Sequence, residues 1–98
     1  MSDLVYVFAH VQARPGHEDR LRDALLKLVT VTEAEPGFLR YDLHQDCANP
    51  GHFAFYEIWQ DQASLDIHAV TDAMRAHQAL TADWIESVTV QTFRKLNG

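Results

Sequence analysis

A glutamate flanked by aromatic residues at alternate positions gives this sequence its clearest chemical signal. Four side chains share one face of a segment with an apolar period of two: Phe53, Phe55, Glu57 and Trp59. A carboxyl group among aromatic rings loses hydration, which raises its pKa unless a hydrogen-bond donor pairs with it. His68, on a helix expected to pack over the same sheet, is a suitable donor. The pattern is therefore typical of a tuned general base.

A purely structural interpretation of the same residues stays open. In it, Glu57 ties a backbone group or a histidine inside the core, and Trp59 only fills space. His77 and Trp84 belong to the last predicted helix, where they are either core or rim residues or line the same cavity as Glu57.

Turn residues divide the chain into segments of regular structure. Runs rich in β-branched and aromatic residues predict strands at 4–13, 38–44, 52–60 and 87–96. Apolar residues three or four positions apart predict helices at 17–34, 62–68 and 72–86, the last two capped by Asp61 and Thr71. Within 38–44, the residues Leu39, Tyr41 and Leu43 form the drier face.

This order of elements, β-α-β-β-α-β, predicts an α+β fold of the ferredoxin-like type, with one four-stranded antiparallel sheet and helices on a single face. The strands at 4–13 and 52–60 carry apolar side chains on both faces. The helix-free side of the sheet would then be exposed in a monomer, and such patches usually mark an interface. We therefore expect a homodimer packed through that side.

Length and charge narrow the possible functions. A chain of 98 residues fits one domain, 1–98. Eight basic side chains against 14 acidic ones give a net charge of −6, so neither nucleic acid nor a membrane is an expected partner. No targeting segment or apolar span of about 20 residues is visible. Because the single cysteine, Cys47, cannot close an internal disulfide, a cytoplasmic location is expected.

The histidines do not show the spacing of a metal site. Imidazole is the commonest transition-metal ligand, and the chain has six: His10, His17, His44, His52, His68 and His77. None forms a His-x-His or His-Glu-x-x-His motif. Cys47 follows Asp46, which disfavours a catalytic thiolate, and no glycine-rich phosphate-binding loop occurs. We expect no metal and no other cofactor.

Several short motifs follow one another along nearly the whole chain. They are Arg14-Pro15-Gly16, Glu35-Pro36-Gly37-Phe38 with Tyr41, the strand Phe53-x-Phe55-x-Glu57-x-Trp59, and Leu65-Asp66-Ile67-His68 before Thr71-Asp72-Ala73-Met74. In this order and at this spacing, they make the chain resemble the antibiotic biosynthesis monooxygenase (ABM) superfamily, and within it the small quinol monooxygenase-like proteins.

The resemblance implies a dimeric α+β barrel, in which two ferredoxin-like sheets pack face to face and each protomer keeps a pocket between its sheet and helices. Members with known activity oxygenate electron-rich aromatics such as quinols or anthrones with dioxygen, using neither metal nor flavin. Carried over to this chain, His68, or Glu57 acting with it, is the catalytic base. The predicted substrate-binding residues are Phe53, Phe55, Trp59, His77 and Trp84.

Such chemistry needs no bound redox cofactor. Deprotonation of a hydroxyaromatic gives an anion that dioxygen oxidises easily, so the protein has to supply only a base, a hydrogen-bond donor and a dry pocket. The expected function is a cofactor-independent monooxygenase acting on a small quinol-like or anthrone-like molecule.

The chain departs from the pattern of its relatives at three positions. Asp61 stands where many carry a serine, a change that a helix N-cap tolerates. Ala73 stands where they often carry a second histidine, so a non-catalytic dimeric domain that binds a small ligand is the alternative function. Haem degradation is disfavoured, because Ala9 occupies the position of an asparagine that haem-degrading members use.

Overall fold

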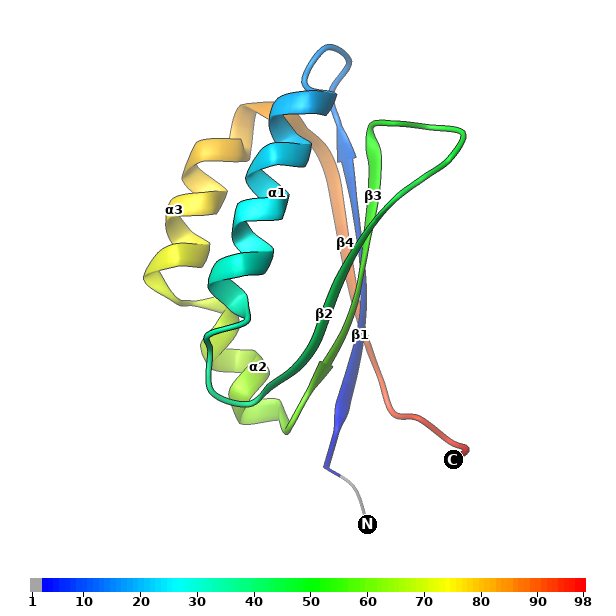
Figure 1. Ribbon diagram of the computed structural model, residues 1–98, viewed down its shortest axis with the longest axis vertical. Helices are drawn as coiled ribbons and strands as arrows, with labels where there is room; N and C mark the ends of the chain where they lie inside the picture. The colour runs from blue at the N-terminus through cyan, green and yellow to red at the C-terminus, as the bar shows by residue number, and fades with distance from the viewer. Residues whose placement is uncertain (1–2) are drawn as a thin grey trace.

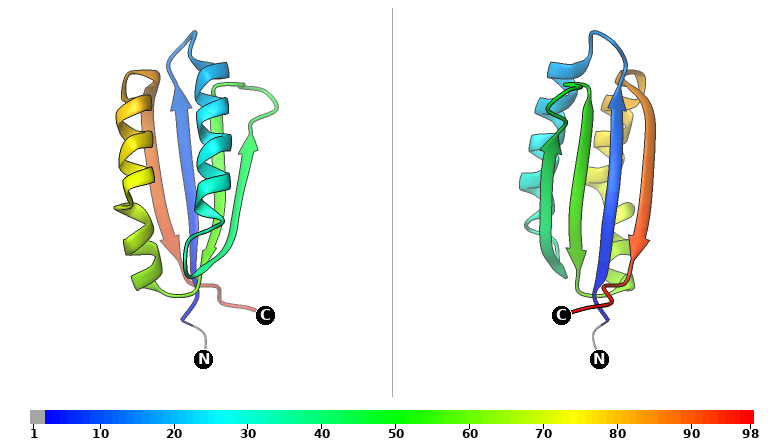
Figure 2. Two further views of the ribbon diagram at one scale, coloured as in Figure 1. Left: turned by 60° about the vertical axis from the view of Figure 1, so that its left-hand side comes forward. Right: turned by 90° about the vertical axis from the view of Figure 1, so that its right-hand side faces the viewer.

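The computed structural model describes residues 3–98. The elements follow in the order β1 (Val5–Ala13), α1 (Glu18–Thr32), β2 (Phe38–Gln45), β3 (His52–Trp59), α2 (Gln62–Ala69), α3 (Asp72–Thr81), a short 3-10 helix η1 (Ala82–Trp84) and β4 (Ile85–Phe93). The strands form one antiparallel sheet in the order β2-β3-β1-β4. All helices lie on one face of it (Figures 1 and 2), so the predicted α+β, ferredoxin-like fold is confirmed.

The inner face of the sheet follows from the period-two patterns of β1 and β3. In β1 the alternate residues Val7, Ala9, Val11 and Ala13 are buried, and in β3 the buried positions are Phe53, Phe55, Glu57 and Trp59. Helix α1 covers these strands with Leu21, Leu25 and Leu28, spaced by four and three residues on one helical face. Burial of each such leucine contributes about 2 kcal/mol to folding.

The predicted drier face of β2 was wrong at one position. Leu39 is 52% exposed, whereas Tyr41 and Leu43 face the core as expected. The cause is a register shift at the start of the strand. Phe38 pairs with Trp59 and Arg40 pairs with Ile58, so Leu39 is an extra residue without a partner in β3, and it turns outward.

The helix caps in the C-terminal half lie where the sequence predicts them, but the boundary between the last helix and the last strand lies earlier than predicted. Asp61 accepts a hydrogen bond from the Ser64 amide at 2.8 Å, and Thr71 accepts one from the Met74 amide at 3.0 Å. The predicted helix to residue 86 ends instead at Thr81 and continues as η1, and the final strand starts at Ile85 rather than at residue 87. Pairing of Ile85 with Ala13 of β1 replaces the helical hydrogen bonds.

An aromatic cluster lies on the helix-free face of the sheet. The ring centroids of Phe8 and Tyr56 are 5.2 Å apart, and those of Phe8 and Phe93 are 5.3 Å apart. Phe8 is 41% and Phe93 48% exposed. This face is thus the one that the helices leave uncovered (Figure 2, right).

Among the helices of residues 3–98, none has the length and apolar character needed to cross a membrane.

The turn between α1 and β2 fixes how α2 approaches the sheet. Gly37 has a positive φ of 81°, and its carbonyl accepts a hydrogen bond of 2.9 Å from the Gln60 amide at the end of β3. A methyl group at Gly37 would overlap the Ser64 side chain in the first turn of α2. The close approach therefore needs a glycine for both its backbone angle and its lack of a side chain.

We expect Gly37→Ala to lower the free energy of unfolding by roughly 2–4 kcal/mol, because strain at positive φ adds to overlap with α2. Gly16→Ala is the matched control: Gly16 has a φ of 89°, but a methyl group there meets nothing within 4 Å. It should cost only about 1 kcal/mol. Urea unfolding of both variants measures the difference, and equal losses would contradict the role of the contact with Ser64.

Candidate active site

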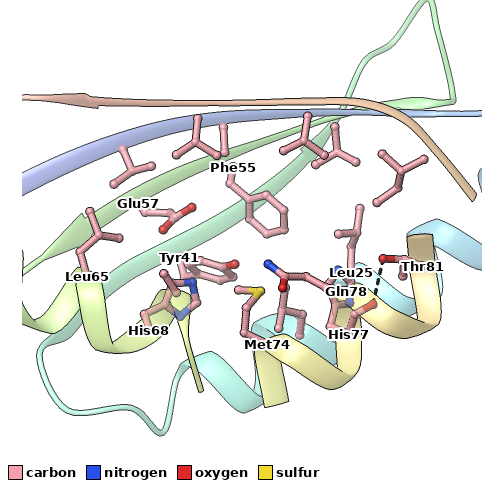
Figure 3. A pocket seen from close by; sticks show the side chains of 18 of the residues that line it. Leu25, Tyr41, Phe55, Glu57, Leu65, His68, Met74, His77, Gln78 and Thr81 are labelled. Atoms are coloured by element: carbon pink, nitrogen blue, oxygen red, sulfur yellow. Dashed lines mark hydrogen bonds between the residues drawn. The ribbon is translucent and has the colours of Figure 1, made fainter. Parts of the chain in front are cut away.

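A cavity of about 410 Å³ lies between the inner face of the sheet and helices α1, α2 and α3 (Figure 3). Small apolar side chains of β1 leave the space: Val7, Ala9 and Val11. The cavity is open on the side of β4, where Val88 and Val90 line it and remain exposed. A mostly apolar wall with a few polar groups is typical of a small-molecule site.

Six polar side chains line this cavity: Tyr41, Glu57, His68, His77, Gln78 and Thr81. The Thr81 hydroxyl is already committed, because it donates a hydrogen bond of 2.9 Å to the His77 carbonyl. Glu57 and His68 lie toward α2, and His77 and Gln78 come from α3 (Figure 3). The polar groups therefore occupy two regions of an otherwise apolar wall.

Glu57 is an acid held in a dry environment. The residue is only 5% exposed, and its Oε1 accepts a hydrogen bond of 2.9 Å from the Trp59 indole nitrogen. Burial raises the pKa of Glu57 to about 7, with a smaller increase from Glu35 and a partly opposing effect of the Trp59 hydrogen bond. The carboxyl group can thus change its protonation state near neutral pH.

His68 is held by a carboxylate from a distant part of the chain. Its Nδ1 lies 3.0 Å from Oε1 and 3.2 Å from Oε2 of Glu35. The two side chains are only 6% and 14% exposed. Because a carboxylate accepts, Nδ1–H is the donor, and a neutral imidazole then carries its lone pair on Nε2. This pairing fixes both the orientation and the tautomer of a potential base.

Aromatic rings pack against the imidazole on two sides. The His68 ring centroid lies 4.6 Å from that of Trp59 and 5.4 Å from that of Tyr41. Tyr41 in turn packs on Phe55 at 4.8 Å. Burial, with a further effect of Glu57, raises the pKa of the Tyr41 hydroxyl well above its ordinary value. Tyr41 is therefore a neutral hydrogen-bonding group at this wall.

The structure brings four of the seven predicted site residues to the cavity wall: Phe55, Glu57, His68 and His77. Phe53 and Trp59 are fully buried behind the wall. Trp84 lies under the Arg20 guanidinium, whose Cζ is 5.6 Å from the centroid of the indole ring. None of these three lines the cavity. The geometry thus gives Trp59 a supporting position behind Glu57 and His68 instead of a stacking position against a ligand.

The expected contact between Glu57 and His68 is replaced by two separate pairs, Glu57 with Trp59 and His68 with Glu35. The sequence analysis named Glu35 only within the Glu35-Pro36-Gly37-Phe38 motif and gave it no role in the site. Its partner is 33 residues away in the chain, so no local spacing pattern reports the contact. Tyr41 was predicted only as a residue of the drier strand face and as part of the same family motif, although it also lines the cavity.

Outside the cavity, a row of hydrogen bonds joins three titratable side chains on the helix-free side. His10 Nδ1 lies 2.9 Å from His52 Nε2, and His52 Nδ1 lies 2.9 Å from an Asp46 carboxylate oxygen. Across residues 3–98, no three or more His, Cys, Asp or Glu side chains gather in a way that could hold a metal ion.

Comparison with known proteins agrees with this architecture. The family model described as "Antibiotic biosynthesis monooxygenase" matches residues 4–80. The chain belongs to the antibiotic biosynthesis monooxygenase family. A crystal structure of PA3566 from Pseudomonas aeruginosa superposes with a TM-score of 0.93 at 32% identity, over 99% of this chain and 98% of that one.

Two further relatives support membership of the ABM family. A crystal structure described as an antibiotic biosynthesis monooxygenase has a TM-score of 0.89 and 33% identity, over 95% of this chain and 99% of that one. The Rv0793 protein of Mycobacterium tuberculosis is 34% identical over 68 residues, which are 69% of this chain. The matched segment spans 66% of the length of Rv0793, and it spans 47% of the length of a second curated relative, the sll1783 protein of Synechocystis sp..

The raised pKa of Glu57 predicts a pH-dependent stability difference. In the unfolded chain the carboxyl group titrates near 4.5, and in the folded chain near 7, so the folded state binds the proton more tightly. The stability that protonated Glu57 contributes is present below about pH 4.5 and is lost as the pH rises through about 7.

Glu57→Gln removes this titration. When the pH is raised from 4.5 to 8, the free energy of unfolding of the variant, relative to that of the unmodified chain, should therefore increase by about 2–3 kcal/mol. Urea unfolding of both proteins at the two pH values measures the change. If the free energies of unfolding of the two proteins differ by the same amount at both pH values, Glu57 has an ordinary pKa.

Proposed function

We propose that this ABM-family protein is a cofactor-independent monooxygenase that oxidises a small electron-rich hydroxyaromatic with dioxygen. The observation that carries the proposal is the buried Glu35–His68 pair, 3.0 Å apart, on the wall of an apolar cavity that also contains Glu57. A cavity of about 410 Å³ is in the range of small-molecule sites and suits a molecule of one to three rings.

His68 is the proposed base for the substrate hydroxyl. Glu35 accepts from Nδ1, which leaves Nε2 to take the proton, and it stabilises the imidazolium that forms. The arrangement has the logic of a carboxylate–histidine pair in other proton-transfer sites, where the carboxylate orients the ring and does not itself react. Glu35 is thus a positioning residue and His68 the catalytic one.

Glu57 is the proposed acid of the same site. With Oε1 engaged by Trp59, a proton on the carboxyl group resides on Oε2. A pKa of about 7 allows the group to be protonated in part at neutral pH. The acid can then donate to a substrate oxygen and return a proton to a leaving oxygen.

The substrate supplies all the electrons in this scheme. After His68 removes the hydroxyl proton, the anion gives one electron to dioxygen, and the two radicals combine to form a carbon–oxygen bond. The peroxide takes back the proton from the His68 imidazolium and becomes a hydroperoxide. Its oxygen–oxygen bond then breaks, Glu57 protonates the departing hydroxide to give water, and the C–H proton of the oxygenated carbon passes to the Glu57 carboxylate, so that both residues return to their starting states. One oxygen atom ends in a new carbonyl or quinone group and the other in water, which accounts for the four electrons that dioxygen accepts.

A second candidate is small-ligand binding without oxidation. It is favoured by Ala73 on α3, at a position where similar proteins often carry a histidine, since loss of a second proton-transfer group would leave the cavity as a binding site only. Saturable binding of a quinol without oxygen uptake would support this candidate over the monooxygenase.

Oxygen uptake with menadiol or anthrone in the presence of EDTA tests the monooxygenase proposal. The protein should exceed the autoxidation rate, and His68→Ala should lower kcat by 100-fold or more, the usual contribution of a general base. Glu35→Gln should lower kcat at least about tenfold and shift its pH profile, because the imidazole loses its anionic partner.

The control for these variants is His44→Gln, which changes an exposed histidine of β2 that does not line the cavity. It should keep full turnover. Uptake by the unmodified protein at the autoxidation rate would overturn the proposal, and unchanged turnover of His68→Ala would remove His68 from the mechanism.

The proposal also includes a homodimer formed through the helix-free face of the sheet. The partly exposed aromatic cluster of Phe8, Tyr56 and Phe93 supports it, since an aromatic patch of this kind is usually covered in an assembly. The rings lie on β1, β3 and β4, so the patch extends across most of the sheet.

Phe8→Glu should convert the dimer to a monomer, because dimerisation would bury a carboxylate without a partner. Ile67→Glu is the matched control, since it places the same charge on an equally apolar, exposed residue of α2 on the helical side. It should remain dimeric. Light scattering coupled to size-exclusion chromatography measures both masses, and a Phe8→Glu variant that stays dimeric would exclude this face.

A further inference from the structure

The charged side chains around the cavity are acidic, and no lysine or arginine of the described residues lines it. Glu57 lines the wall, and Glu35 lies directly behind His68. The residues that line the cavity include no lysine or arginine, although all eight such residues of the chain lie within the described part. Two of them are committed elsewhere: Arg22 pairs with Asp19 and Asp23, and Arg40 pairs with Asp42.

The histidines do not offset this imbalance. His68 is paired with Glu35, so even its protonated form has a neighbouring carboxylate that cancels its charge. Burial lowers the pKa of His77, which makes the neutral ring the dominant form at neutral pH. Tyr41, across the cavity wall, is a neutral hydroxyl. A ligand bound here therefore meets one carboxyl group and no unpaired positive charge.

From this arrangement we infer that the cavity selects uncharged hydroxyaromatics and rejects aromatics that carry a carboxylate, sulfonate or phosphate. The inference rests on the proposed function and specifies its substrate class. A negatively charged substituent would lose its hydration beside Glu57 in a low-dielectric space, and both effects oppose binding. A hydroxyl or carbonyl oxygen of a neutral ligand instead finds the Tyr41 hydroxyl and the Gln78 amide at the wall.

The Trp59 indole strengthens this selection. Its N–H already donates to Oε1 of Glu57, so it is not free to donate to an anionic group of the ligand. Deprotonated Glu57 then presents Oε2 as an acceptor only, and protonated Glu57 presents a single donor. In neither state does the pair of residues offer an anion the two or more donors by which carboxylates and phosphates are normally held.

Two ligands of nearly equal shape test the inference, 6-hydroxy-2-naphthamide and 6-hydroxy-2-naphthoate, which differ in the charge of one substituent. Binding is measured by calorimetry at pH 8, where Glu57 is mostly ionised. The amide should bind the unmodified protein at least about tenfold more tightly than the carboxylate. In Glu57→Gln the ratio should fall below about threefold.

Asp66→Asn is the matched control, because it removes one negative charge from an exposed position of α2 that does not line the cavity. It should keep the tenfold ratio. Equal binding of the two ligands, or tighter binding of the carboxylate, would overturn the inference while leaving the monooxygenase proposal intact. Selective binding of the amide without oxygen uptake from quinols would support the inference and overturn the monooxygenase. Failure of both ligands to bind would also overturn the inference, whereas the oxygen-uptake assay alone decides the monooxygenase proposal.

Discussion

The contact between Glu35 and His68 connects the parts of the chain on which the site depends. It joins the loop after α1 to the end of α2, and both partners are largely removed from water. Breaking such a pair by removing one partner usually costs about 3–5 kcal/mol, since the remaining group loses its compensation. Close packing of Gly37 against Ser64 brings the same two segments together. The position and the tautomer of the histidine are therefore fixed by one local arrangement.

Because His68 pairs with Glu35, Glu57 has no cationic partner among residues 3–98. Its carboxylate accepts a hydrogen bond from a neutral indole, which compensates its burial only in part, so its pKa stays raised. Two carboxyl groups within one site thus have different environments and different uses. Glu35 orients a base through a hydrogen bond, whereas Glu57 is poised to hold or release a proton.

The cavity itself results from how the helices cover the sheet. Helix α1 fills the space over β1 and β3 with leucines, and α3 packs against α1. The inner face of β4 stays exposed, so the space between α3 and this strand remains open. Small residues of β1 deepen it. The site is therefore dry at its inner wall and accessible at one edge, as a binding site for an apolar molecule requires.

The sequence by itself determined the main helices and strands, their order and the faces of the strands except at Leu39, because periodicity and capping are local properties. It also placed Phe55, Glu57, His68 and His77 among the site residues. Only the tertiary structure decided the pairing: which acid holds His68, which donor holds Glu57, and that Trp59 and Phe53 lie behind the wall. The contact between Glu35 and His68 joins residues 33 positions apart in the chain, so no local pattern reports it. Glu57 and Trp59 are only two positions apart, but side chains on one strand face differ in depth according to which helix covers them.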